Sequence, residues 1–123
     1  KESYPQLGKL VEDTCRQLGV EVEVYQSNHE GDLVDKIQAA YGAKDAIVIN
    51  PAAYTHTSVA ILDALKAVAL PAVEVHISAV SSREPFRQIS YAGMACVRTY
   101  QGLGFDGYVQ AIRFLKQLLE VNA

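Results

Sequence analysis

The sequence of 123 residues lacks the features that mark several classes of protein. It contains no apolar run near the ~18 residues that a membrane-spanning helix requires. No basic segment leads into an apolar one, so no signal peptide is visible. It also has no block of Lys or Arg, and its formal net charge of -3 makes binding to nucleic acid unfavourable. We therefore expect a globular protein with neither a membrane nor a nucleic acid as a partner.

Cysteine is scarce, and its placement argues against two kinds of site. Cys15 and Cys96 are far apart and lack the paired spacing that is typical of disulfide frameworks and zinc sites. We expect both to be buried free thiols in a reducing compartment, and hence a cytoplasmic protein.

Motifs that bind metals, phosphates or cofactors are also missing. The three histidines show neither HxxxH nor HExxH spacing, and the nucleophile elbow Gly-x-Ser-x-Gly does not occur. No phosphate-loop motif is present. Gly102-Leu103-Gly104 lacks the third glycine of a dinucleotide fingerprint, which leaves it as a turn. The sequence therefore predicts no metal and no cofactor.

Half of the residues are apolar, and their spacing predicts helices that alternate with strands. Glu21–Gln26 alternates like a half-buried strand, whereas Asp45–Asn50 is a nearly continuous apolar run, typical of a strand buried on both faces. Strands separated by single helices imply right-handed crossovers and a parallel sheet, so we expect one α/β domain over residues 1–123. The expected helices cover about residues 7–18, 33–41, 61–68 and 108–119, and the expected strands residues 21–26, 45–50, 72–77 and 95–100, with a helical turn at 83–89.

Polar side chains gather where the predicted strands end. In open α/β sheets, ligands bind beyond the carboxyl ends of the strands. Asn50 and His56 follow one such end and His76 stands at the next. Arg83 and Arg87 come soon after, one helical turn apart, so they share a face. A single histidine at a strand end is commonly structural, but two histidines with an amide and an arginine pair at neighbouring ends favour a binding site.

Glu74 and His76 are two residues apart on one predicted strand, so their side chains share a face. A carboxylate beside an imidazole raises the pKa of that imidazole and fixes its orientation, as a general acid near neutral pH requires. The alternative is a buried structural ion pair. Thr57 and Ser58 come shortly after Asn50, and either of them can simply cap the helix expected at residues 61–68.

Several short motifs occur in a fixed order along the chain. In chain order they are Ser27–Gly31 (Ser-Asn-His-Glu-Gly), Asn50–Ser58 (Asn-Pro-Ala-Ala-Tyr-Thr-His-Thr-Ser) with Asp63–Leu65 beyond it, Glu74–Ser78 (Glu-Val-His-Ile-Ser), Arg83–Arg87 (Arg-Glu-Pro-Phe-Arg), Ser90-Tyr91, and Gly102-Leu103-Gly104 with Gly107-Tyr108. Together they resemble the signature of the type II 3-dehydroquinate dehydratase family. The resemblance runs from about residue 7 to residue 119 with the short spacings preserved, which makes it specific.

This resemblance implies a flavodoxin-like fold, a three-layer sandwich around a parallel sheet. It implies a lyase that dehydrates 3-dehydroquinate to 3-dehydroshikimate in the shikimate pathway of aromatic amino acid biosynthesis, with no metal or cofactor. It also implies a homo-oligomer, a dodecamer built from trimers.

The resemblance further implies roles for the residues nearest the reacting atoms. His76 would donate the proton to the departing hydroxyl, and Glu74 would hold His76. Asn50 would hold the substrate and help to stabilise the enolate intermediate through a bound water. This reaction needs two things from an active site: fixed hydrogen-bond donors that stabilise the enolate, and a proton for a poor leaving group.

Five other residues would bind the substrate if the resemblance holds. Ile77 and Ser78 would bind its carboxylate through backbone amides and the Ser78 hydroxyl, and His56 and Arg87 would contact its ring hydroxyls. Asp63 would reach into the site of a neighbouring subunit.

The sequence departs from the family pattern at four loop positions. Ala52 stands where the family usually has Gly, Ala79 where Asn commonly follows the Ser, and Ser81–Ser82 where a His-Ala pair is frequent. We expect these changes to alter loop geometry slightly and not to abolish function.

A larger departure lies at the start of the chain. The family's opening strand, its mobile lid and the lid's essential Arg and Tyr-Gly base are not found ahead of the first predicted helix. Tyr4 is tempting as the base, but Pro5 follows it instead of Gly. We therefore expect an N-terminally incomplete domain, in which the strand at Glu21–Gln26 lacks a neighbour.

This gap leaves a second hypothesis open. It is a non-catalytic assembly or binding module that keeps the fold but has lost the tyrosine base. A flavodoxin-like receiver is disfavoured, because Tyr100-Gln101-Gly102 offers no Lys after the last strand.

Overall fold

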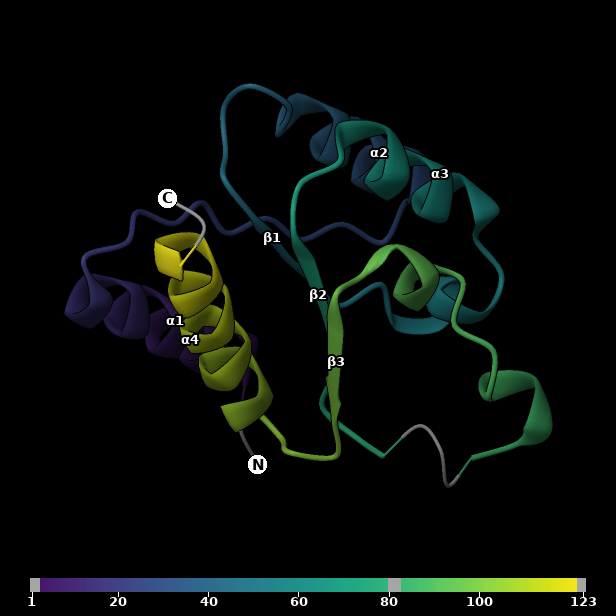
Figure 1. The fold of residues 1–123 in the computed structure, drawn as a ribbon. Coiled ribbons are helices and arrows are strands. Elements are labelled where there is room, and N and C mark those ends of the chain that lie inside the picture. Colours follow the sequence, from purple (N-terminus) through teal and green to yellow (C-terminus); the bar gives the residue numbers. More distant parts are fainter. Residues whose placement is uncertain (1–2, 80–82, 122–123) are drawn as a thin grey trace.

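The computed structural model describes residues 3–79 and 83–121. They form three layers, with α2 and α3 on one side of the sheet and α1 and α4 on the other (Figure 1). The helices and strands, in chain order, are α1 (Tyr4–Leu18), α2 (Glu30–Ala39), β1 (Ile47–Ile49), α3 (Val59–Val68), β2 (Ala72–His76), β3 (Arg98–Gln101) and α4 (Asp106–Val121), with short 3₁₀ turns at Ala52–His56, Pro85–Arg87 and Ala92–Ala95.

The three strands form one parallel sheet in the order β1-β2-β3. All five residues of the central strand β2 are buried, because helices cover both of its faces. Successive side chains of β2 point to opposite faces, so Val73 and Val75 pack against α4 while Ala72 packs towards α3. The same alternation sends Glu74 and His76 to the α3 side of the sheet.

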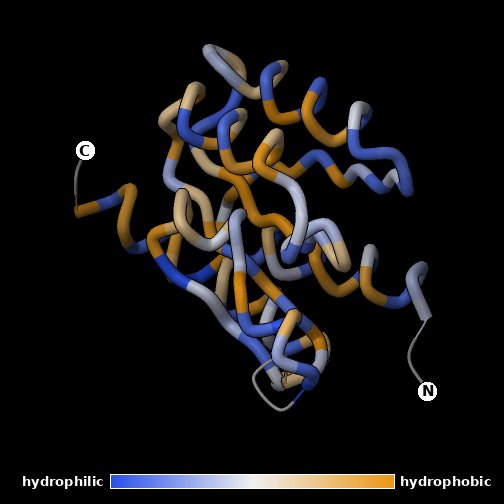
Figure 2. The backbone as a smooth tube through the Cα atoms, turned by 90° about the vertical axis from the view of Figure 1, so that its right-hand side faces the viewer, coloured by the Kyte–Doolittle hydropathy of each residue, from blue (hydrophilic) through white to orange (hydrophobic). Residues whose placement is uncertain are grey.

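Two apolar clusters hold the layers together. One lies between the sheet and α2 and α3, around Ile37, Ile61 and Leu65, and the other joins the sheet to α4 through Ala111 and Leu115. Figure 2 shows orange and blue alternating along the helices, as expected for helices that bury one face. The predicted flavodoxin-like α/β class is confirmed by this arrangement.

Local sequence signals set the helix ends. Ser3 and Gln6 form a capping box at the start of α1, and Gly19 ends it in the left-handed conformation at φ 70°. Ser58 caps α3 by accepting a hydrogen bond from the backbone N–H of Ile61 at 2.9 Å. The capping role considered for Ser58 is thus confirmed.

The prediction of a strand at Glu21–Gln26 is wrong. These residues form no strand and are exposed at every position, although Val22 and Val24 alternate as expected for one. A strand needs a hydrogen-bonding neighbour, and within the described residues the segment pairs with none. Alternation alone cannot supply that neighbour.

The other strands differ from prediction only at their ends. β1 is shorter than the predicted Asp45–Asn50, and β3 starts at Arg98 because the chain forms a 3₁₀ turn at Ala92–Ala95 first. Ser81–Ser82, one of the expected loop departures, lies outside the described residues. None of the helices in the described ranges is long and apolar enough to cross a membrane.

Both cysteines are free thiols, as predicted. Cys15 is buried in α1, and burial raises the pKa of its thiol. Cys96 is only partly buried, so the prediction of a buried thiol holds for Cys15 and not for Cys96. Burial and the nearby charge of Glu74 raise the pKa of Cys96 to about 12, which keeps this thiol protonated and unreactive.

Candidate active site

A pocket of about 340 Å³ lies over the carboxyl ends of β1 and β2, where the sequence predicts a site. Asn50 follows β1 directly, and His76 is the last residue of β2. The pocket brings together six of the eight residues to which the resemblance assigns roles, and it adds Arg83, which the strand-end pattern also indicated, and two alanines. Its lining consists of Asn50, Ala52, Ala53, His56, His76, Ile77, Ser78, Arg83 and Arg87.

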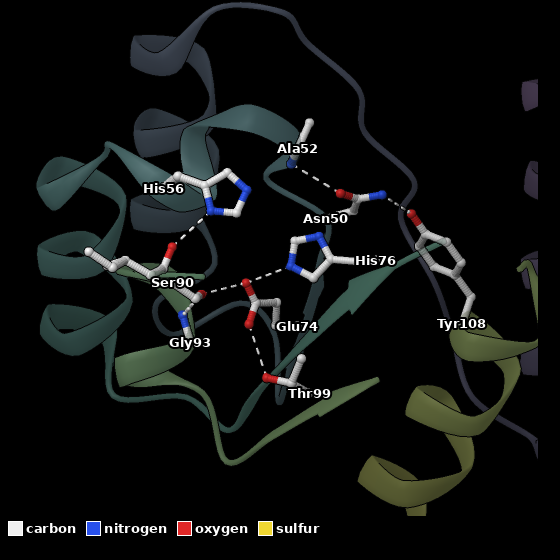
Figure 3. Close-up of polar contacts among 10 residues, drawn as sticks. Asn50, Ala52, His56, Glu74, His76, Ser90, Gly93, Thr99 and Tyr108 are labelled. Atoms are coloured by element: carbon white, nitrogen blue, oxygen red, sulfur yellow. Dashed lines mark hydrogen bonds and ion pairs between the residues drawn. The ribbon is translucent and has the colours of Figure 1, made fainter. Parts of the chain in front are cut away.

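His76 lines this pocket, and the buried carboxylate of Glu74 lies behind it. Nε2 of His76 lies 2.8 Å from Oε2 of Glu74, and their side chains are 10% and 1% exposed. A carboxylate only accepts, so Nε2 carries the proton of this hydrogen bond, and Nδ1 is the ring nitrogen left for other chemistry. Figure 3 shows His76 between Glu74 and Asn50.

Glu74 accepts hydrogen bonds from three donors. Besides His76, the hydroxyl of Ser90 donates to Oε2 at 2.7 Å and that of Thr99 donates to Oε1 at 3.0 Å. Burial alone raises the pKa of Glu74, but these hydrogen bonds and the proximity of His76 together hold that pKa below its ordinary value. The carboxylate is therefore charged at neutral pH. Sequence reasoning missed Ser90 and Thr99 as partners.

The amide of Asn50 is held at both ends. Its Oδ1 accepts from the backbone N–H of Ala52 at 3.0 Å, and its Nδ2 donates to the Tyr108 hydroxyl at 2.9 Å (Figure 3). Burial raises the pKa of Tyr108, so its hydroxyl stays neutral. Sequence reasoning placed Tyr108 at the start of the helix expected at about residues 108–119 and gave no signal for this contact.

His56 is oriented by the backbone. Its Nδ1 lies 2.8 Å from the carbonyl oxygen of Ile89, which can only accept, so Nδ1 carries a proton. In the neutral ring, Nε2 is then an acceptor for a substrate hydroxyl. This geometry suits the hydroxyl-binding role that the resemblance implies for His56.

Two arginines bring positive charge to the pocket. Arg83 donates to the Ser78 hydroxyl at 3.1 Å, while Nε of Arg87 donates to Glu84 at 3.0 Å. Ser78 and Arg83 together suit an anionic group, because guanidinium and hydroxyl donors both bind carboxylates. The sequence pointed to both arginines through their helical spacing.

Some candidates lie away from the pocket. Asp63 is exposed on α3 and does not line the pocket. His29 stands at the start of α2, and Tyr4 is half exposed at the start of α1. A Tyr-Gly pair does occur at Tyr41–Gly42, but Tyr41 is 72% exposed after α2 and is no pocket residue.

No group of three or more His, Cys, Asp or Glu side chains is placed to hold a metal ion in the parts of the chain that the structure describes. The pocket instead presents imidazole, amide, hydroxyl and guanidinium groups, and one of its imidazoles, His76, is hydrogen-bonded to a buried carboxylate behind it. Such a set can bind a hydroxylated anion and deliver a proton to it.

Comparisons with known proteins agree on one family. The model of the family described as Dehydroquinase class II matches residues 1–116. A 3-dehydroquinate dehydratase of Clostridium acetobutylicum is 49% identical over 117 residues, which are 95% of this chain and 81% of that protein. Another, of Bordetella petrii, is 54% identical over 110 residues, covering 89% of this chain and 76% of that protein.

A solved structure gives the same result. The type II dehydroquinase of Butyrivibrio crossotus matches with a TM-score of 0.91 and 49% identity, over 93% of this chain and 80% of that one. Sequence motifs, fold and pocket thus point the same way, and the chain belongs to the class II dehydroquinase family.

Proposed function

We propose that the pocket at the strand ends dehydrates 3-dehydroquinate to 3-dehydroshikimate through an enolate intermediate, with His76 as the general acid. The observation that carries this proposal is that His76, which lines the pocket, is held from behind by the buried carboxylate of Glu74 at 2.8 Å. The relatives named as 3-dehydroquinate dehydratases favour an enzyme over a non-catalytic assembly module.

The reaction divides into two proton transfers. A base first removes a proton from the carbon α to the ketone, and the electron pair moves into the enolate. The enolate then collapses to a carbon–carbon double bond, and the bond to the β-hydroxyl breaks. That hydroxyl takes the proton from Nδ1 of His76 and leaves as water. We expect the base to be the tyrosine of the family's lid, as the resemblance implies.

Glu74 and Asn50 support these two steps differently. The charged Glu74 stabilises the imidazolium form of His76 and fixes which nitrogen faces the substrate. Asn50 is fixed by Ala52 and Tyr108, so it offers an oriented amide for the enolate, directly or through a water. Donors fixed before the reaction need no reorganisation as charge develops.

We assign the remaining pocket residues to substrate binding. Ser78, beside Arg83, and the backbone amides of Ile77 and Ser78 would take the substrate carboxylate. The acceptor nitrogen of His56 and the guanidinium of Arg87 would bind the ring hydroxyls. These contacts would orient the leaving hydroxyl towards His76.

We also propose that the protein assembles into trimers and then a dodecamer in the cytoplasm. Asp63 is exposed and does not line the pocket of its own chain, which suits a role in a neighbouring subunit's site. Phe86 and Met94 are both 61% exposed, and apolar surface of this kind favours burial in an assembly. The free thiols fit a reducing compartment. Light scattering tests the assembly, and a monomer with full turnover would contradict it.

The activity is tested by adding 3-dehydroquinate to the full-length protein and following the absorbance of the conjugated enone product. We expect turnover in the wild type and in His29→Ala, since His29 lies outside the pocket, and strong loss in His76→Ala. Equal turnover in His76→Ala and wild type would refute the assignment of His76.

A further inference from the structure

Glu74 is a buried carboxylate, and the protein fixes both of its oxygens. Ser90 donates to Oε2, the oxygen that also accepts from His76, while Thr99 donates to Oε1 (Figure 3). The two hydroxyls come from different parts of the fold, since Thr99 belongs to β3 and Ser90 to the loop ahead of the 3₁₀ turn at Ala92–Ala95. Donors on both oxygens prevent the carboxylate plane from rotating.

The hydroxyl of Ser90 is itself oriented. Its oxygen accepts the backbone N–H of Gly93 at 2.9 Å, so its single proton is directed to Glu74. The next residue is anchored too, because the N–H of Tyr91 donates to the carbonyl of Thr55 at 2.8 Å. Ser90 is thus a fixed donor and not a mobile surface hydroxyl.

Gly93 is part of the same arrangement for steric reasons. A Cβ atom added to it would lie 2.8 Å from Oε1 of Glu74 and 2.8 Å from Oγ of Ser90. Distances this short require a shift, and both neighbours are held by hydrogen bonds. A residue with a side chain here would displace the carboxylate or its donor.

We infer that Ser90 and Thr99 are positioning residues that keep Glu74 charged and oriented, so that His76 presents Nδ1 to the leaving hydroxyl, and that Gly93 provides the space for this arrangement. The inference rests on the role proposed for His76. The three act through Glu74 and do not touch the substrate. Their removal should therefore change proton delivery more than substrate binding.

Removing one hydroxyl at a time tests the inference in the full-length protein. Thr99→Val keeps the shape of the side chain without its donor, and Ser90→Ala removes the other donor. Thr14→Val is the matched control, because the Thr14 hydroxyl is also part-buried but donates to Leu10 within α1 at 2.8 Å. We expect kcat to fall about tenfold in each of the first two variants, with KM within about twofold of wild type. Thr99→Ser should restore kcat, and Thr14→Val should leave it unchanged.

The pH profile distinguishes positioning from simple loss of structure. Each lost donor removes a hydrogen bond to the charged form of Glu74, so the pKa of Glu74 should rise, and with it the pH below which kcat falls. The low-pH limb of kcat therefore moves to higher pH in Thr99→Val and Ser90→Ala and stays in place in Thr14→Val. A kcat and low-pH limb equal to wild type in both variants would overturn the inference.

An inactive wild type and a misfolded Ser90→Ala variant would each still leave the inference testable. A wild type without turnover contradicts the proposed function, and the inference is then tested by ¹⁵N NMR titration of the His76 ring, which needs no turnover. A ring titration that Thr99→Val leaves unchanged overturns the inference, and a shifted one supports it. If Ser90→Ala fails to fold by circular dichroism, Thr99→Val and its Thr99→Ser rescue decide alone.

Discussion

Ala52 occupies the left-handed backbone region at φ 53°, and its N–H holds the Asn50 amide. This region costs an L-residue roughly 1–2 kcal/mol, whereas glycine adopts it freely. Glycine also loses more conformational freedom on folding, which costs about 0.5–1 kcal/mol. The side chain of Ala52 is exposed, so little buried surface is lost. The strain that Ala52→Gly relieves exceeds the entropy that it costs, so we expect this change to stabilise the protein by about 0.5–1 kcal/mol.

Ala69 provides a matched control, because it ends α3 at φ 55° and lies outside the pocket. Thermal unfolding at one protein concentration should show both Ala52→Gly and Ala69→Gly melting about 2–4 °C above wild type. Because Ala52→Gly keeps the N–H that binds Asn50, its kcat should stay within about twofold of wild type. A lower melting temperature for Ala52→Gly together with a higher one for Ala69→Gly would refute the strain argument.

Two further predictions concern the groups behind the pocket. Tyr108→Phe removes the acceptor for Asn50 Nδ2, so we expect kcat to fall about threefold to tenfold with little change in melting temperature, and an unchanged kcat in initial-rate assays would count against it. The pKa of Glu74 is lower in the folded protein than in the unfolded chain. Ionised Glu74 therefore stabilises the fold at any pH above its pKa in the unfolded chain. This stabilisation is lost as the pH falls through the pKa of Glu74 in the folded protein. Urea unfolding from pH 7 to pH 3 should therefore show wild type losing more stability than Glu74→Gln, and parallel curves would contradict this.

The position of the site could be predicted from the sequence because it follows from local pattern. Apolar runs place β1 and β2 in a parallel sheet, and polar residues after those runs must meet at one edge. Asn50, His56 and His76 do meet there, and the two-residue spacing of Glu74 and His76 gives their hydrogen bond directly. Period-two alternation is enough for that contact.

The hydrogen bonds behind the site could not be predicted, because they join segments that are distant in the chain and no local pattern in the sequence indicates them. Tyr108 is 58 residues from Asn50, and Thr99 is 25 residues from Glu74. Only the packing of α4 and the register of β3 bring them together. The failed strand at Glu21–Gln26 has the same cause, because its pattern is local but pairing requires a neighbour elsewhere in the chain.

We propose that His76 serves the second half of the reaction, the loss of the hydroxyl, and not the first. This proposal is tested most directly by incubating His76→Ala with 3-dehydroquinate in deuterium oxide and measuring two rates together. These are deuterium incorporation α to the ketone and formation of the enone. We expect exchange to continue while elimination falls by about 100-fold or more. Elimination at the wild-type rate, or loss of exchange and elimination in equal measure in a folded variant, would contradict it.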